Sequence, residues 1–168
     1  SDTFDINRDG LVDYVKSFNG GNWRVKVNNG SGFGPEIDWP APGHWTHFSE
    51  SISSYDTFDI NGDGLPDLVD ASGNPNWRLY LNNGSGFDSQ IVWAAPEAWL
   101  SYNTDDSVKA AIYDTFDING DNLPDFVRSP QSGSNWRVGF NTGNGFSSER
   151  DWIAPPAGYG YLRFAEGS

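Results

Sequence analysis

Apolar and polar residues alternate along several short stretches of this chain. Residues 76–82 (NWRLYLN) show the pattern most clearly, and residues 22–28 and 135–141 repeat it. In an extended chain, one face carries Trp77, Leu79 and Leu81, and the other carries Arg78, Tyr80 and Asn82. A period of two with aromatic and branched side chains predicts a half-buried β-strand in each of these stretches.

Shorter strands are predicted around this central one. Residues 55–60 (YDTFDI), 67–71 (DLVDA) and 89–93 (SQIVW) have the composition of strands, and Asn-Gly turn chemistry follows residues 76–82. No long stretch has apolar residues at helical spacing. Each copy of the pattern therefore carries about four short strands, which is the content of one propeller blade.

These strands belong to a unit that occurs three times. DTFDINRDGLVDYV begins at residue 2, DTFDINGDGLPDLV at 56 and DTFDINGDNLPDFV at 114, so the copies start 54 and 58 residues apart. A period of this size indicates a repeat architecture. We therefore expect a single repeat domain, residues 1–168, composed of repeats 2–55, 56–113 and 114–168.

Each repeat opens with an acidic loop of nine residues. The first, third, fifth and ninth residues have side-chain oxygens, and the seventh offers a backbone carbonyl oxygen. The five positions are Asp5, Asn7, Asp9, Leu11 and Asp13 in the first repeat, Asp59, Asn61, Asp63, Leu65 and Asp67 in the second, and Asp117, Asn119, Asp121, Leu123 and Asp125 in the third.

An oxygen-only ligand set at these positions favours Ca²⁺, one ion per repeat. Mg²⁺ demands stricter octahedral geometry, and Zn²⁺ prefers His or Cys, of which the chain has no Cys. Gly10 and Gly64 stand where the loop turns sharply, and Asn122 replaces them in the third copy. The alternative is that Asp and Asn in turns bond to their own backbone. Because all three copies keep every oxygen, we favour calcium.

The pattern D-x-N-x-D-G-x-x-D, followed by a strand and NNGSGF, resembles the FG-GAP or VCBS repeat. Such repeats form the blades of integrin α-subunit propellers, of calcium-binding fungal and bacterial lectins, and of propeller regions in bacterial toxin-complex proteins. The resemblance implies an all-β fold of three tandem four-stranded blades, with the loop residues named above as calcium ligands. The chain departs from the pattern at Asn122 and at Arg8, whose positive charge we expect to lower calcium affinity slightly.

Closed propellers of this family have more than three blades, and three alone leave open edges that invite pairing. Three arrangements stay open. Two chains self-associate into a six-bladed ring, three units close into a threefold body, or the chain is part of a larger propeller.

The charge balance limits the partners. The net charge is −13, with 10 Lys and Arg against 23 Asp and Glu. Nucleic acids and anionic membranes are bound by clustered basic residues, so we expect neither as a partner. No apolar run approaches the ~20 residues that span a bilayer, so we expect no membrane insertion. Three Ca²⁺ ions would reduce the charge of the nine loop carboxylates from −9 to −3.

Aromatic residues suggest a carbohydrate-binding module or lectin whose partner is a glycan. Trp45, Trp99 and Tyr161 recur at one position after a Pro-containing loop, where their rings could stack on sugars. Three such sites would give multivalency. Three further sets of repeated residues are expected to be structural instead. Trp23, Trp77 and Trp136 belong to the core, Trp39, Trp93 and Trp152 pack between blades, and Arg24, Arg78 and Arg137 pair with a neighbouring loop Asp.

The alternative is a protein-interaction or scaffold segment of a larger extracellular or toxin-complex protein. Residues 101–112, which are longer than their counterpart in the first repeat, are the feature that favours it. We expect no enzymatic activity, because His44 and His47 lack a third zinc ligand and the paired carboxylates are assigned to calcium. Calcium sites with few carboxylates typically bind at ~10⁻⁴–10⁻³ M, as in extracellular modules, so we expect secretion.

Overall fold

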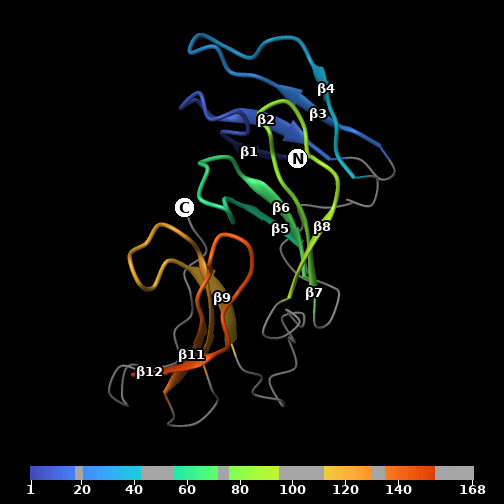
Figure 1. Cartoon of the computed structure of the whole chain (residues 1–168). Helices are drawn as coiled ribbons and strands as arrows, with labels where there is room; N and C mark the ends of the chain where they lie inside the picture. Colours follow the sequence, from blue (N-terminus) through green and yellow to red (C-terminus); the bar gives the residue numbers. More distant parts are fainter. Residues whose placement is uncertain (18–20, 43–54, 72–75, 95–111, 130–134, 154–168) are drawn as a thin grey trace, which may run out of the picture. The chain divides into compact units, whose positions relative to one another are not determined.

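The structure, a computed structural model, describes residues 1–17, 21–42, 55–71, 76–94, 112–129 and 135–153, and all their regular elements are β-strands (Figure 1). In these ranges no helix has the length and hydropathy to cross a membrane. The strands are β1 (Asp2–Phe4), β2 (Asp13–Lys16), β3 (Trp23–Lys26), β4 (Ile37–Trp39), β5 (Tyr55–Phe58), β6 (Asp67–Asp70), β7 (Asn76–Tyr80), β8 (Ile91–Ala94), β9 (Ile112–Phe116), β10 (Asp125–Ser129), β11 (Trp136–Gly139) and β12 (Arg150–Trp152).

Each repeat forms one antiparallel sheet of four strands. The orders are β1-β2-β3-β4, β5-β6-β7-β8 and β9-β10-β11-β12, so neighbours in sequence are neighbours in the sheet. None of the three sheets closes into a barrel. This arrangement confirms the all-β class and the four strands per repeat that the alternating pattern predicts.

Strand β7 shows how the alternation produces the sheet. Trp77 and Leu79 are fully buried, whereas Arg78 between them is exposed. Asn82, just beyond the strand, is an exception. It was expected on the polar face and is only 3% exposed. Its side-chain amide donates hydrogen bonds to backbone carbonyl oxygens, and these bonds offset the free-energy cost of removing a polar group from water.

The chain divides into two compact units, Ser1–Tyr102 and Asn103–Ser168. The first unit contains the sheets of the first two repeats, and one hydrophobic cluster joins them. The first repeat contributes Ile6, Val15, Trp23, Val25 and Trp39 to it, and the second contributes Leu68 and Phe87. Trp39 therefore belongs to a core that the first two repeats share.

In the second unit, the buried core residues come from the sheet of the third repeat. Phe126, Val127 and Val138 are buried. The ring of Phe126 meets that of Phe146 edge-on, with centroids 6.2 Å apart, and Phe140 meets Trp152 at 5.9 Å. Aromatic pairs of this geometry stabilise a core beyond the area they bury.

The arginines on the polar strand face pair with acids of their own sheet. Arg24 pairs with Asp38 on β4, Arg78 Nη1 lies 3.0 Å from Asp70 on β6, and Arg137 Nη1 lies 2.7 Å from Asp151 on β12. The predicted loop partners are therefore wrong. A residue on the neighbouring strand is closer to a strand arginine than any residue of a loop at the strand end.

Candidate metal centres

Every acidic loop joins the first two strands of its sheet. The first loop connects β1 to β2, the second β5 to β6, and the third β9 to β10. The last residue of the first strand faces the ninth loop residue across the hairpin, with the pairs Phe4↔Asp13, Phe58↔Asp67 and Phe116↔Asp125. The first and ninth acids of each loop are thus brought to the same end of the hairpin.

The first acid of each loop is bound by backbone amides of the turn. In the second repeat, Asp59 Oδ1 accepts from the amides of Gly62 at 2.7 Å and Asp63 at 3.0 Å, and Oδ2 accepts from Gly64 at 2.7 Å. Asp117 in the third repeat is bound in the same way. The amide of Asn122 is the main reason that the pKa of Asp117 lies below its usual value, with smaller contributions from neighbouring amides.

The third and fifth residues of each loop are hydrogen-bonded to each other. Asn61 Oδ1 accepts from the amide of Asp63 at 2.9 Å, and Asn61 Nδ2 donates to Asp63 Oδ2 at 2.9 Å. Asp63 Oδ1 then accepts from the amide of Leu65 at 2.8 Å. The first and third loops repeat these bonds. The turn hydrogen bonding that was the alternative to calcium is therefore present in all three loops.

The ninth acid is buried in each repeat. Asp67 Oδ2 accepts from the amide of Ile60 at 3.2 Å, and Oδ1 accepts from the amide of Asn82 at 2.8 Å. The pKa of Asp67 is raised to about 7, chiefly by burial and to a smaller extent by the charges of Asp63 and Asp59, against the lowering effect of the amides. Asp13 and Asp125 are also buried and have raised pKa values, chiefly because of burial.

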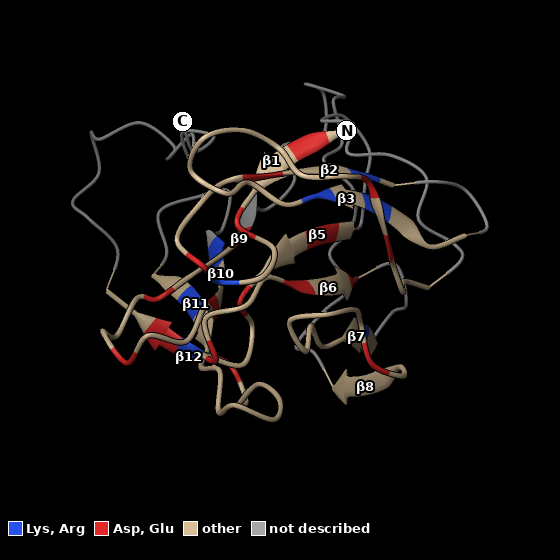
Figure 2. Cartoon of the chain, turned by 90° about the horizontal axis from the view of Figure 1, so that it is seen from above, with Lys and Arg blue, Asp and Glu red and all other residues tan. Residues whose placement is uncertain are grey.

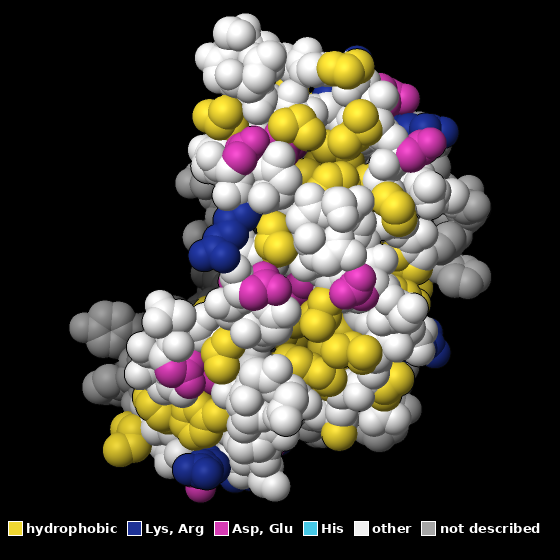
Figure 3. Space-filling model, turned by 45° about the horizontal axis from the view of Figure 1, so that its top comes forward, with side chains coloured by type: hydrophobic (Ala, Val, Ile, Leu, Met, Phe, Trp, Pro, Cys, Tyr) yellow, Lys and Arg dark blue, Asp and Glu magenta, His cyan; other side chains and the backbone are white. Residues whose placement is uncertain are grey.

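The donor set fits a hard cation chemically, since it offers oxygen alone. The loops are nevertheless no preformed cage of carboxylates. In the described part of the chain, no group of three or more His, Cys, Asp or Glu side chains is arranged to hold a metal ion. Figure 2 shows acidic segments in loops and strands alike, and Figure 3 shows acidic side chains in several separate groups on the face in view.

The backbone conformations of the loops agree with the sequence. Gly10 has φ of 85°, Gly64 has 88° and Asn122 has 68°, so Asn takes the left-handed turn position as expected. Arg8 also has a positive φ, 63°, at the position of Gly62 and Gly120. Its guanidinium Nη1 donates to the backbone carbonyl oxygen of Asp63, which links the first loop to the second.

The sequence pattern did not identify the Asn at the start of each turn as a hydrogen-bonding partner of the ninth loop acid. Besides its amide bond to Asp67, Asn82 donates from Nδ2 to the carbonyl oxygens of Ile6 at 2.8 Å and Pro66 at 3.2 Å. Asn28 and Asn141 make the equivalent amide bonds to Asp13 and Asp125. The signal was available, because this Asn is identical in all three copies whereas the next residue changes to Thr142.

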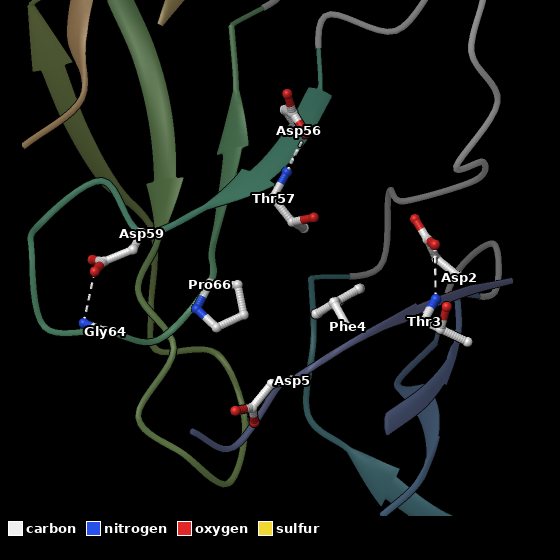
Figure 4. A pocket seen from close by; sticks show the side chains of 9 residues that line it. All are labelled: Asp2, Thr3, Phe4, Asp5, Asp56, Thr57, Asp59, Gly64 and Pro66. Atoms are coloured by element: carbon white, nitrogen blue, oxygen red, sulfur yellow. Dashed lines mark hydrogen bonds between the residues drawn. The ribbon is translucent and has the colours of Figure 1, made fainter. Parts of the chain in front are cut away.

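A hollow of about 390 Å³ lies between the first two repeats (Figure 4). Asp2 and Asp56, which line it, each accept a hydrogen bond from the backbone amide of the following residue, Thr3 or Thr57, at 2.7 Å. The complete lining is Asp2, Thr3, Phe4, Asp5, Asp56, Thr57, Asp59, Gly64 and Pro66. The predicted ligand positions Trp45, Trp99 and Tyr161 lie outside the described residues, as do His44 and His47.

Two solved structures are similar to this chain in fold. One is the Tc holotoxin pore of Photorhabdus luminescens, with a TM-score of 0.62 and 21% identity over 93% of this chain and 7% of that chain. The other is a lectin of Agrocybe aegerita that recognises non-reducing terminal N-acetylglucosamine, with a TM-score of 0.61 and 21% identity over 90% of this chain and 38% of that chain. This chain thus spans only a minor part of either protein.

A family model matches part of the sequence. No curated protein matches this sequence. Residues 5–69, which include the first two acidic loops, match the FG-GAP-like repeat. The chain therefore carries the FG-GAP-like repeat that its acidic loops indicated, with the match falling on residues 5–69.

Proposed function

We propose that this chain is a non-catalytic, calcium-stabilised module that binds carbohydrate. The observation that carries the proposal is the hollow between the first two repeats. Its volume of about 390 Å³ lies at the small end of the range of small-molecule sites, which is about 300–1,000 Å³, and it is open to solvent. Its lining combines carboxylates, threonine hydroxyls and one phenylalanine.

These groups suit the chemistry of a sugar. The carboxylates of Asp2 and Asp56 can accept hydrogen bonds from sugar hydroxyls, and the hydroxyls of Thr3 and Thr57 can both donate and accept. Phe4 offers an apolar surface for the C–H face of a pyranose ring. The similarity in fold to a lectin that recognises N-acetylglucosamine supports this class of ligand. Trp45, Trp99 and Tyr161 stay predicted contacts of the same ligands.

Calcium is the second part of the proposal. In the second repeat, Asp59, Asn61, Asp63, Asp67 and the carbonyl oxygen of Leu65 would hold the ion, and the matching residues would do so in the other repeats. When bound, Ca²⁺ supplies positive charge among carboxylates that otherwise repel one another. The raised pKa of Asp67 supports this, because the neighbouring acids contribute to it. Such a site suits a secreted protein.

The alternative remains a protein-interaction or scaffold segment of a larger extracellular or toxin-complex protein. The similarity in fold to a toxin-complex component supports it in the same way. The two functions differ in one measurable respect, because a scaffold segment would show no affinity for a free sugar.

A binding experiment distinguishes them. The protein in millimolar calcium is applied to a glycan array and then titrated calorimetrically with the best glycan, with N-acetylglucosamine as the first candidate. Asp2→Asn removes one charged acceptor of the hollow, and we expect about tenfold weaker binding. Glu36→Gln, the same change at an exposed residue outside the hollow, should bind like the wild type.

We expect the glycan to be recovered chemically unchanged after incubation. If no glycan binds the wild type, or if Asp2→Asn and Glu36→Gln bind equally, the proposal is wrong at this hollow and the scaffold function is favoured.

A further inference from the structure

The contact between the first two repeats has a donor face and a receiving face. The donor face belongs to the second repeat. Its Phe87 ring packs edge-on against the indole of Trp23, with centroids 4.9 Å apart. The amide of Phe87 donates to the carbonyl oxygen of Pro40 at 2.8 Å, and Asn82 Nδ2 donates to the carbonyl oxygen of Ile6 at 2.8 Å.

The fit at this contact is close. A Cβ atom built on Gly86 would lie 3.0 Å from the ring of Pro40, so the second repeat presents a glycine where the first repeat comes nearest. Phe87 is only 9% exposed, and Ile6 and Trp23 of the receiving face are fully buried. The contact therefore combines a buried aromatic ring, Phe87, with two hydrogen bonds and a close approach of the backbone at Gly86.

The first repeat carries its own copy of the donor face. Phe33 occupies the position of Phe87 but is 54% exposed. Among the described residues, nothing lies within 4 Å of a Cβ atom built on Gly32, the counterpart of Gly86. Asn28, the counterpart of Asn82, is less buried, and its side-chain amide donates to Val12 in its own repeat. This face has the same chemistry as the donor face of the second repeat, but no described residue of the first two repeats covers it.

The third repeat carries a copy of the receiving face. Trp136 and Ile118 stand at the positions of Trp23 and Ile6, and both are partly exposed where their counterparts are fully buried. Ile153 stands at the position of Pro40 and is 85% exposed. The first and third repeats thus hold the two halves of the contact that joins the first repeat to the second.

We propose that the donor face of the first repeat (Asn28, Gly32 and Phe33) docks on the receiving face of the third repeat (Ile118, Trp136 and Ile153) in a second copy of this chain. The partner is another copy because this chain carries both complementary halves. In the docked state, Phe33 packs on Trp136, its amide donates to the carbonyl oxygen of Ile153, and the Asn28 side chain donates to the carbonyl oxygen of Ile118.

Such a contact is heterologous, since each copy uses two different faces. Two copies joined twice would form a closed ring of six repeats, whereas a rotation that does not close would give a filament. The Phe33 ring meets that of Tyr14 edge-on at 6.5 Å, so its side chain is partly held in place before docking. Less ordering of the side chain is then required on binding.

The first test measures mass in solution as a function of protein concentration, by sedimentation equilibrium. The wild type should reach at least twice the chain mass of 18.5 kDa. Phe33→Ala removes the aromatic ring of the donor face, and we expect the dissociation constant of self-association to rise at least about thirtyfold. Val92→Ala is the matched control, because Val92 is similarly exposed, at 55%, and lies outside both faces. A monomer at every concentration, or equal self-association of both variants, overturns the proposal.

The second test locates the contact with a disulfide, which is unambiguous because the chain has no cysteine. The spacing of Gly86 and Pro40 predicts that Gly32→Cys and Ile153→Cys come within bonding distance across the docked faces. A chain with Gly32→Cys is mixed with a differently tagged chain with Ile153→Cys under mild oxidation. Covalent dimers carrying both tags are expected, and only homodimers or no crosslink would contradict the proposal.

The chain with both substitutions separates a second copy from closure within one chain. Crosslinked species of two or more chains on a non-reducing gel support the proposal. A disulfide found only within single chains, at monomer mass, would show that the two faces meet inside one chain, which rules out the second copy as the partner.

Discussion

At the scale of single residues, the acidic loops depend on left-handed backbone positions. Gly62 and Gly120 have φ of 79° and 84° at the fourth loop residue, and the first repeat places Arg8 there with φ of 63°. A residue with a Cβ atom costs about 1 kcal/mol more than glycine in this conformation. Arg8 offsets part of that cost by its bond to Asp63 in the next loop.

Arg8 leads to a prediction about Gly64. A Cβ atom at Gly64 would overlap the Arg8 guanidinium, whereas a Cβ atom at Gly10 has nothing within 4 Å among the described residues. Both glycines have positive φ, so Gly10→Ala carries backbone strain alone. We expect Gly10→Ala to lower the free energy of unfolding by about 1 kcal/mol. Gly64→Ala should cost about 0.5 kcal/mol more, because the exposed Arg8 side chain can move aside but then loses its bond to Asp63. Chemical denaturation measures both.

The control is the Arg8→Ala background, in which the overlap is gone. There the two glycine substitutions should cost the same. An unchanged difference between them would show that Arg8 does not contact Gly64 in solution.

The turn geometry of the acidic loops could be predicted from sequence, because it depends on residue type and spacing within nine residues, whereas calcium at these loops stays a prediction. The positive φ of Asn122 and the turn bonds of Asn61 and Asp63 follow from local rules that a linear pattern reveals. The bond from Asn82 to Ile6 could not be predicted in this way, since 76 residues separate the two. Such contacts depend on how sheets pack.

At the scale of elements, one motif position has different environments in different repeats. Phe33 and Phe87 share the GF motif, yet Phe87 is 9% exposed and Phe33 is 54% exposed. The difference arises from the neighbouring sheet, because Phe87 has Trp23 of another repeat beside it. A sequence repeat predicts identical local structure and gives no information on which copy is covered.

This difference predicts unequal effects of one substitution. Phe87→Ala should lower the free energy of unfolding by about 3 kcal/mol or more, because it leaves a cavity against Trp23. Phe33→Ala should change it by less than about 0.5 kcal/mol in solutions too dilute for self-association, since the side chain is largely hydrated. Thermal or urea unfolding followed by tryptophan fluorescence compares them. Equal losses would contradict the packing of Phe87 between the two repeats.

At the scale of the whole molecule, acidity and metal binding are linked. The chain has a net charge of −13, and nine of its carboxylates stand at the first, fifth and ninth loop positions. Their mutual repulsion opposes folding, and it is strongest where burial lowers the local dielectric constant, as at Asp67. A cation bound to the folded loops alone would stabilise the fold by linkage.

Loss of one loop acid should therefore reduce the effect of calcium. With Asp63→Ala, we expect the calcium-dependent rise in melting temperature to shrink, because one of three sites loses a ligand. Glu36→Ala, at an exposed acid outside the loops, should keep the full rise. Differential scanning calorimetry at several calcium concentrations makes the comparison, and an undiminished rise in the Asp63 variant would exclude Asp63 as a ligand.

The most direct test of the account is the melting temperature of the unmodified chain in millimolar calcium and in excess chelator. Ten millimolar calcium is about 10 to 100 times the expected dissociation constant and contributes about 1.4 to 2.7 kcal/mol per site, so calcium should raise the melting temperature by several degrees or more. Magnesium at the same concentration should have a smaller effect. Identical melting curves in calcium and in chelator would contradict the account, because the acidic loops would then be turns that hold no ion.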